Sequence, residues 1–270
     1  MTSKLIPKNP EEVMVIRQVT PEITTLSLPF KRYGRIKIGG RGTLVRLQDG
    51  SVAVFSPVAL TPAVRETVAS MGEVKYIAAP DMEHHIFLGP WHEAYPSAKI
   101  IGPDGLREKR EKQNNERVPF HTEFKASTKA SVKIDPAFDA EFDYEFVDGH
   151  TNKELVFNHR PTKTLIEADL LFNMPAIEQY SKSTEKYDTG FFTKFWTALN
   201  NTKGDAKWQK RVIWYGTSAG NRSSFSQSMK KINGWDFDRI IPCHGDVIEN
   251  NGKHVFQSVM EWHLSKAKAQ

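Results

Sequence analysis

The sequence predicts an α/β protein in which strands and helices are mixed along the whole chain of 270 residues. Short apolar runs bounded by turn residues are typical of strands, and they alternate with segments whose apolar residues recur at helical spacing. No linker rich in Pro, Gly or Ser separates two halves, and the chain has no repeat of fixed period. We therefore expect a single layered domain over residues 1–270.

The N-terminal part is predicted to contain strands followed by a helix. Prolines and a glycine-rich turn interrupt the strands expected over residues 15–47. The turn residues 48–51 lie between the apolar runs 43–47 and 52–55, which is the pattern of a hairpin. Apolar residues at helical spacing then predict a helix over 62–71.

Short apolar runs predict two buried strands in the next part of the chain, at 74–79 and 98–101. Between them we expect helices at 83–88 and 91–95, split by Gly89 and Pro90. A charged helix is expected after Pro103, and residues 120–140 are expected to be rich in loops.

The C-terminal half is predicted to add strands and then helices. Aromatic and acidic residues alternate over 141–147, which predicts a half-buried strand. Further strands are expected at 155–159, 164–168 and 238–242. Helices are expected at 191–200, 218–232 and 253–267, with a polar loop between the first two.

Charge and composition exclude several classes of function. Lys and Arg number 37 against 32 Asp and Glu, and this small excess is dispersed, so no nucleic acid is expected as a partner. No apolar run is long enough to span a bilayer, and no membrane partner is expected. No secretory signal is visible and Cys243 is the single cysteine, which favours a cytoplasmic location. A small-molecule substrate is the remaining expectation, and the oligomeric state is left open.

Polar residues follow four of the predicted strands. The pair His84 and His85 follows the strand at 74–79, and His150 follows the strand at 141–147. Asp169 lies in an otherwise apolar run, and His244 follows the last strand. Imidazole and carboxylate are the usual ligands of zinc and of iron, and loops at strand ends commonly carry functional groups.

Each of these residues also has a structural interpretation. A histidine at a turn commonly bonds to the backbone, and Asp169 could cap a helix that starts at Leu170. The order and spacing of all five favour a metal site. Cys243, next to His244, could be a ligand or a redox-active thiol, although a small buried residue is the simpler interpretation.

These segments resemble the motifs of the metallo-β-lactamase superfamily. The superfamily has the motif Gly-His-Thr, which is found here at 149–151. A later Gly-Asp motif followed by apolar residues and Phe is similar to residues 168–172, with Ala in place of Gly. A final Gly-His at a strand end is similar to residues 243–244, with Cys in place of Gly. The resemblance, which runs from about Gly42 to Gly245, implies an α/β fold that is a four-layer αββα sandwich.

The first motif of the superfamily, His-x-His-x-Asp-His, differs in this chain. Its positions fall on Pro80, Met82, His84 and His85, so two ligands of the first metal are missing. A His pair at this place is similar to the divergent DUF4336 branch of the superfamily. The resemblance implies one ion, zinc or alternatively iron, held by His84, His85, Asp169 and His244 with His150 in reach.

Three functions follow from this resemblance. The first is a metal-dependent hydrolase of an ester, thioester or lactone, with Asp81 or Glu83 as the catalytic base. The second is an iron-dependent oxidoreductase of the same fold. The third is a non-catalytic member that binds partners through an aromatic-rich surface. In this fold residues 174–232 lie over the metal edge, and we expect them to contact the substrate.

Overall fold

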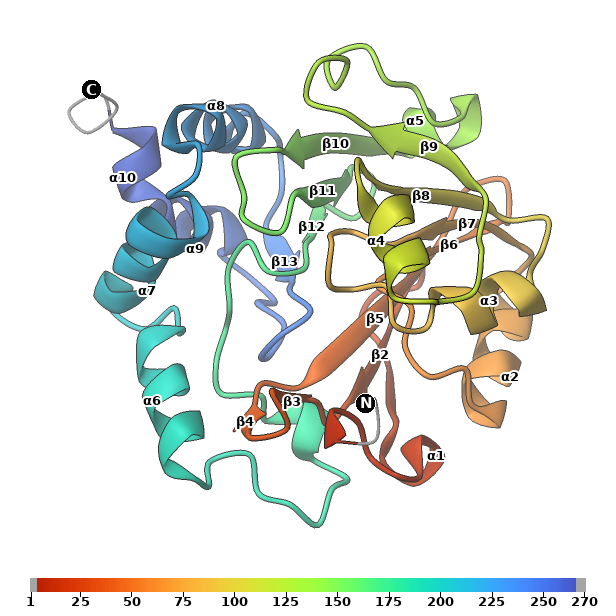
Figure 1. Ribbon diagram of the computed structural model, residues 1–270, viewed down its shortest axis with the longest axis horizontal. Coiled ribbons are helices and arrows are strands. Elements are labelled where there is room, and N and C mark those ends of the chain that lie inside the picture. The colour runs from red at the N-terminus through yellow and green to blue at the C-terminus, as the bar shows by residue number, and fades with distance from the viewer. Residues whose placement is uncertain (1–3, 266–270) are drawn as a thin grey trace.

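Two β-sheets lie face to face between layers of helices in the computed structural model, which describes residues 4–265 (Figure 1). The larger sheet has the strand order β1-β2-β5-β6-β7-β8-β9 and the smaller one β10-β11-β12-β13. The larger sheet consists of β1 (Val15–Gln18), β2 (Ile23–Leu28), β5 (Gly40–Arg46), β6 (Val52–Phe55), β7 (Val74–Ala78), β8 (Lys99–Pro103) and β9 (Phe120–Phe124). The smaller sheet consists of β10 (Phe142–Val147), β11 (Glu154–His159), β12 (Thr164–Ile166) and β13 (Arg239–Ile241).

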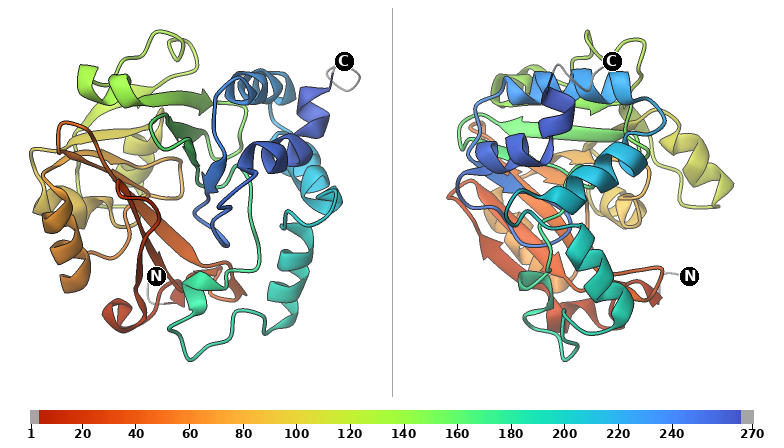
Figure 2. Two further views of the ribbon diagram at one scale, coloured as in Figure 1. Left: turned by 180° about the vertical axis from the view of Figure 1, so that it is seen from behind. Right: turned by 90° about the vertical axis from the view of Figure 1, so that its left-hand side faces the viewer.

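The helices cover the two outer faces of this pair of sheets, and a small hairpin extends from the larger sheet (Figure 2). The hairpin is formed by β3 (Lys31–Arg32) and β4 (Ile36–Lys37). The helices are α1 (Pro10–Val13), α2 (Pro62–Met71), α3 (Leu88–Ala94), α4 (Leu106–Lys112), α5 (Pro136–Glu141), α6 (Phe191–Leu199), α7 (Lys207–Val212), α8 (Arg222–Asn233), α9 (Gly252–Val259) and α10 (Glu261–Leu264). A 3₁₀ turn, η2 (Glu178–Tyr180), and a π-helical turn, η3 (Ile213–Thr217), complete the elements.

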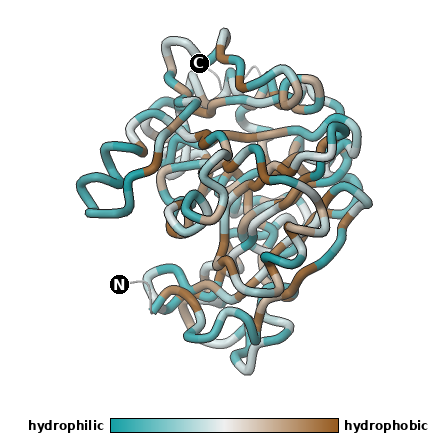
Figure 3. Tube along the Cα trace, turned by 90° about the vertical axis from the view of Figure 1, so that its right-hand side faces the viewer, coloured by the Kyte–Doolittle hydropathy of each residue, from teal (hydrophilic) through white to brown (hydrophobic). Residues whose placement is uncertain are grey.

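Side chains that alternate along each strand build three apolar layers. On β6, Val54 faces the helices α2 and α3, whereas Phe55 faces the other sheet. On β11, Phe157 faces Phe55, and Val156 faces the helices α8 and α9. Because both faces of these strands are covered, their apolar residues are continuous, and many apolar segments lie inside the molecule (Figure 3). The predicted αββα sandwich is therefore the observed architecture.

Several predicted elements occur where they were expected. The helix α2 has the predicted bounds, and Thr61 caps it by accepting a hydrogen bond from Val64 N–H. The hairpin of β5 and β6 pairs Thr43 with Phe55 in antiparallel register. None of the helices within residues 4–265 has the length and apolar character needed to cross a lipid bilayer.

Three predictions of local structure are wrong and a fourth is incomplete. The segment 83–87 is a turn, and Leu88 begins α3, with Gly89 and Pro90 inside its first turn, where a missing N–H costs no hydrogen bond. The segment 120–140 has the expected loop only at 125–135, between β9 and α5. The polar loop before α8 contains α7 and η3. The last helix is broken at Met260 into α9 and α10, and its predicted end at 267 lies outside the described residues.

The parallel pairing of β12 with β13 determines where the candidate site lies. Leu165 pairs with Ile240 and Ile166 with Ile241, so both strands end at the same edge of the smaller sheet. A further bridge between Asn173 and Gly245 holds the two following loops together. Gly245 has φ of 85°, and a Cβ there would lie 2.2 Å from Asn173 O, so glycine is required for this close approach.

Candidate metal centre

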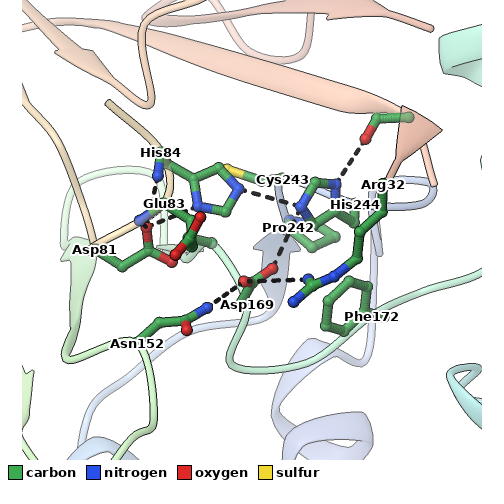
Figure 4. A network of polar contacts seen from close by, with 12 residues as sticks. Arg32, Asp81, Glu83, His84, Asn152, Asp169, Phe172, Pro242, Cys243 and His244 are labelled. Atoms are coloured by element: carbon green, nitrogen blue, oxygen red, sulfur yellow. Dashed lines mark hydrogen bonds and ion pairs between the residues drawn. The ribbon is translucent and has the colours of Figure 1, made fainter. Parts of the chain in front are cut away.

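Three segments that are far apart in the sequence bring two histidines and one aspartate together (Figure 4). His84 lies in the turn after β7, Asp169 in the loop after β12, and His244 in the loop after β13. We call these three residues the trio. Asp169 and His244 follow paired parallel strands, so the sheet itself places them side by side.

The ligand atoms of the trio converge. His84 Nε2 lies 3.1 Å from His244 Nε2, and His244 Nε2 lies 3.3 Å from Asp169 Oδ1. All three atoms lie within 4.8 Å of one another. Within residues 4–265 no second group of three or more His, Cys, Asp or Glu ligands meets this distance.

Each member of the trio is oriented by a partner on its far side. His84 Nδ1 lies 2.9 Å from Asp81 Oδ1, and His244 Nδ1 lies 2.6 Å from the carbonyl oxygen of Gly39. Asn152 Nδ2 donates to Asp169 Oδ2 at 2.7 Å. Carboxylate and carbonyl groups that hold the far nitrogen of an imidazole are typical of histidines that bind metal.

These partners determine which atoms of the trio carry lone pairs. A carbonyl and a carboxylate accept hydrogen bonds, so both Nδ1 atoms carry the hydrogen and both Nε2 atoms of the neutral rings present lone pairs. Asp169 Oδ1 is buried and accepts no hydrogen bond. In that neutral state two imidazole lone pairs and one carboxylate oxygen face the same point, which is the arrangement that a proton or a metal cation satisfies.

The electrostatics of the trio favour a positive charge at this point. Burial disfavours a charged His84, but the carboxylates of Asp81 and Asp169 outweigh burial and raise the pKa of His84 to about 9. Burial would raise the pKa of Asp169, yet the neighbouring His244, His84 and Arg32 lower it below its usual range. With this raised pKa, His84 carries a second proton at neutral pH, and that proton lies between the ligand atoms of the trio.

The donor set fits one divalent ion. Two imidazoles and one carboxylate leave coordination positions free, as in catalytic zinc sites. The same set is typical of non-haem iron(II) centres. The orphaned Asp169 Oδ1 and the two opposed Nε2 atoms are the observations on which this fit rests.

The structure places His85 away from the trio. Its Nδ1 lies 3.2 Å from Nη1 of Arg110, and its carbonyl oxygen accepts a second hydrogen bond from the same guanidinium at 2.8 Å. Burial and the charges of Arg110 and Lys109 lower the pKa of His85 to about 4. Adjacent residues of a turn point in different directions, and here only His84 faces the other ligands.

His150 lies next to Asp169 but faces the backbone. Its Nδ1 accepts a hydrogen bond from Asn152 N–H at 3.0 Å, and its Nε2 lies 3.4 Å from Asp169 O and 3.5 Å from Glu154 Oε2. The preceding Gly149 packs against α8, where a Cβ would lie 2.5 Å from Asn221 O. In this structure the Gly-His-Thr motif therefore supports the loop that carries Asp169.

The two predicted bases have different surroundings. Asp81 is fully buried, and its Oδ1 accepts hydrogen bonds from the backbone N–H groups of Glu83 and His84 as well as contacting the His84 ring. Glu83 has a side chain that is 57% exposed and forms an ion pair with Lys109 at 2.7 Å. Asp81 is thus a positioning residue for His84, and Glu83 is the more accessible carboxylate.

The sequence analysis missed three residues that act on Asp169. Asn152 follows the Gly-His-Thr motif directly, which is a signal that could have identified it. Glu154 accepts hydrogen bonds from the N–H groups of Ala168 and Asp169, and a glutamate at the start of an apolar strand was its signal. Arg32 lies 4.0 Å from Asp169 Oδ2, and no local pattern marks it.

Cys243 is buried, and burial raises the pKa of its thiol well above the ordinary value. Its sulfur does not belong to the trio. A thiol that stays protonated is a poor ligand and a poor nucleophile, so this site uses Cys243 as a small buried residue.

Comparisons with known proteins identify a family for this chain. Residues 33–214 match the family described as "Domain of unknown function (DUF4336)". No curated protein sequence matches the chain.

Solved structures with the same fold include metallo-beta-lactamases and a flavodiiron core. DIM-1 metallo-beta-lactamase is 12% identical with a TM-score of 0.58, and the match covers 95% of this chain and 98% of that one. A metallo-beta-lactamase from Pontibacter korlensis is 10% identical with a TM-score of 0.56, covering 92% and 99%. The Flv1 flavodiiron core from Synechocystis sp. PCC6803 is 12% identical with a TM-score of 0.63, covering 93% of this chain and 60% of that one. The chain therefore has the metallo-β-lactamase fold.

Proposed function

The chain belongs to the DUF4336 family, and from its fold and the trio we propose that it is a metal-dependent hydrolase of an ester, thioester or lactone. One ion, for which we propose zinc, would be held by His84 Nε2, His244 Nε2 and Asp169 Oδ1. A bound zinc ion supplies Lewis acidity and lowers the pKa of a coordinated water toward ~7. A cytoplasmic location stays a prediction.

The chain's own residues have defined roles in this proposal. Asp81 and the Gly39 carbonyl hold the two imidazoles in the tautomer that presents Nε2. Asn152 occupies Asp169 Oδ2 and leaves Oδ1 for the ion. Glu83 is the exposed carboxylate nearest in sequence to His84, and we propose it as the group that accepts a proton from water. His85 and His150 would support the loops without touching the ion.

One observation carries the proposal, which is the convergence of two imidazole lone pairs and an orphaned carboxylate oxygen in a buried place. The raised pKa of His84 reflects the same negative field, which favours a positive charge at this point. The pairing of β12 with β13 and the three orienting partners hold the groups there. A purely structural role would not need the ligand atoms of His84, Asp169 and His244 to face one another.

Metal analysis of purified protein, followed by assays on esters, thioesters and lactones, tests the proposal. The variants are His244→Ala and, as a matched control, His254→Ala, which removes an exposed histidine on α9. We expect about one ion per chain in the natural protein and in H254A, less than ~0.2 in H244A, and hydrolysis that falls at least ~100-fold in H244A. Less than ~0.2 ion per chain in the natural protein at micromolar free zinc would refute the proposal.

An iron-dependent oxidoreductase is the second candidate, because two histidines and a carboxylate also suit iron(II). Elemental identity and visible absorbance of the bound metal distinguish the two.

A non-catalytic role is supported by Pro80 and Met82, which stand where the resemblance expects ligands of a first metal. Full biological activity in an H84A and H244A double variant would favour that third function.

A further inference from the structure

Arg32 extends from the β3–β4 hairpin toward the trio and is poorly satisfied there (Figure 4). Its guanidinium makes one long ion pair, 4.0 Å from Asp169 Oδ2, and has Tyr33 as a side-chain hydrogen-bond partner, and its side chain is 29% exposed. Asn152 already donates to the same oxygen at 2.7 Å. A guanidinium carries five N–H donors, so Asp169 and Tyr33 leave part of the hydrogen-bonding capacity of Arg32 unused.

Aromatic rings hold this guanidinium in place. Its Cζ lies 5.4 Å from the ring centroid of Tyr33 and 5.5 Å from that of Trp196 on α6. Trp196 in turn packs edge-on against Phe172, and Phe172 stacks on the ring of His244. The rings therefore connect Arg32 to the trio by direct contacts, and the buried indole Nε1 of Trp196 has no hydrogen-bond partner.

The charges near Arg32 leave it without a full counter-charge. When Asp169 Oδ1 binds a divalent ion, its negative charge is shared with that ion. Glu83 is paired with Lys109. Of the other buried carboxylates around Asp169, Glu154 and Glu167 each accept two backbone N–H groups. Asp81 is held by the N–H groups of Glu83 and His84 and by the His84 ring. The positive charge of Arg32, whose side chain is 29% exposed, then remains available to an anion beside the trio.

We propose that Arg32 binds a carboxylate group of the substrate beside the trio, so that the substrates are carboxylate-bearing esters, thioesters or lactones with an apolar body. This inference rests on the proposed function, whose substrate class it narrows. The planar fork of arginine binds a carboxylate through two parallel hydrogen bonds. The exposed ring of Tyr33 and the half-buried ring of Trp196 lie next to it and can contact an apolar body.

Lys31 provides a matched control for Arg32. It lies on the same strand, its side chain is also 29% exposed, and its charge is paired with Glu185 at 2.6 Å. The variants R32Q and K31Q each remove one positive charge from the hairpin. Only R32Q removes the fork that faces the trio, so the comparison separates a local contact from a general change in charge.

The test is a calorimetric titration with benzoate and with its neutral analogue benzamide, on metal-free and on zinc-loaded protein. We expect the natural protein and K31Q to bind benzoate at least ~10-fold more tightly than R32Q does, and all three to bind benzamide alike. The benzoate affinity of R32K should lie between those of the natural protein and R32Q, because lysine keeps the charge and lacks the planar fork. Zinc content measured on the same samples should be equal in all variants.

Equal benzoate affinity in R32Q and K31Q, or no benzoate binding by the natural protein, would overturn the inference. Loss of zinc in R32Q would also overturn it, because Arg32 would then act by holding Asp169. If the natural protein takes up no zinc, the hydrolase proposal fails, whereas a difference between R32Q and K31Q in metal-free protein would still support an anion site at Arg32.

Discussion

At the scale of single residues, the geometry of the trio depends on groups that would not touch the ion. Asp81 is fully buried and holds the His84 ring through Nδ1, while two backbone N–H groups hold Asp81 itself. The carbonyl of Gly39 does the same for His244, although Gly39 lies far away in the sequence. Through these partners the fold itself fixes the direction in which the two lone pairs point.

We predict that Asp81→Asn weakens metal binding ~10–100-fold, because the amide is a poorer acceptor for His84 Nδ1–H and leaves the ring tautomer free to change. Competition with a chelating dye measures this affinity. The control is Glu83→Gln, which changes an exposed carboxylate paired with Lys109 and should alter affinity less than ~2-fold. A D81N protein that binds zinc as tightly as the natural one would show that Asp81 does not position His84.

The sequence identified much of this site and failed at particular residues. Asp169 and His244 could be recognised because each follows a strand within a motif. The choice between His84 and His85 could not be made, because neighbouring residues of a turn differ only in direction. Arg32 was missed because its approach to Asp169 depends on a hairpin that no local pattern connects to the site.

At the scale of elements, the packing of α8 against α10 contains a buried histidine. The ring of His263 lies between Ser226 Oγ, 2.9 Å from Nδ1, and Ser218 Oγ, 3.4 Å from Nε2. It also contacts the rings of Trp214 and Phe225. Burial, assisted by the charge of Arg222, lowers the pKa of His263 to about 4.

This histidine makes the protein less stable in acid. Its folded pKa of about 4 lies below its ordinary value of 6.5, so the unfolded chain takes up the proton first. Its contribution to stability is therefore complete above pH 6.5 and is lost as the pH falls toward 4. The free energy of unfolding of the natural protein falls between pH 7 and pH 5. We predict that this fall is about 2 kcal/mol smaller in His263→Gln, as measured by urea unfolding at the two pH values.

The control for this prediction is His254→Gln, an exposed change on α9 that should leave the pH dependence unaltered. An H263Q variant with the same pH dependence as the natural protein would contradict it.

Elements with a strong periodic pattern were predicted well, as α2 and the hairpin of β5 and β6 show. Short elements without one, such as β9 and α7, are held by tertiary contacts and could not be predicted.

At the scale of the whole molecule, the contact between the two sheets holds the edge that carries the trio. Phe55 on the larger sheet contacts Phe142 and Phe157 on the smaller one, with ring centroids 5.4 and 4.8 Å apart. We predict that Phe55→Ala lowers the free energy of unfolding by ~3–5 kcal/mol, because it leaves a cavity between the sheets. Chemical unfolding followed by circular dichroism measures this change.

Phe191→Ala is the matched control, since Phe191 on α6 is 77% exposed and its loss should cost less than ~0.5 kcal/mol. Similar destabilisation by both variants would contradict the sandwich core described here.

The layered fold was predictable because strands and helices alternate along the whole chain, and the motifs indicated its family. The sequence analysis expected residues 174–232, which include α6, to contact the substrate. The contact of α6 with the β3–β4 hairpin could not be predicted, since it joins segments distant in sequence.

The most direct test of the metal centre is an anomalous difference map from crystals of zinc-loaded protein, recorded at the zinc absorption edge. The trio predicts one peak within ~2.0–2.2 Å of His84 Nε2, His244 Nε2 and Asp169 Oδ1. No peak at this place, or a peak bound by His85 or His150 instead, would contradict the account.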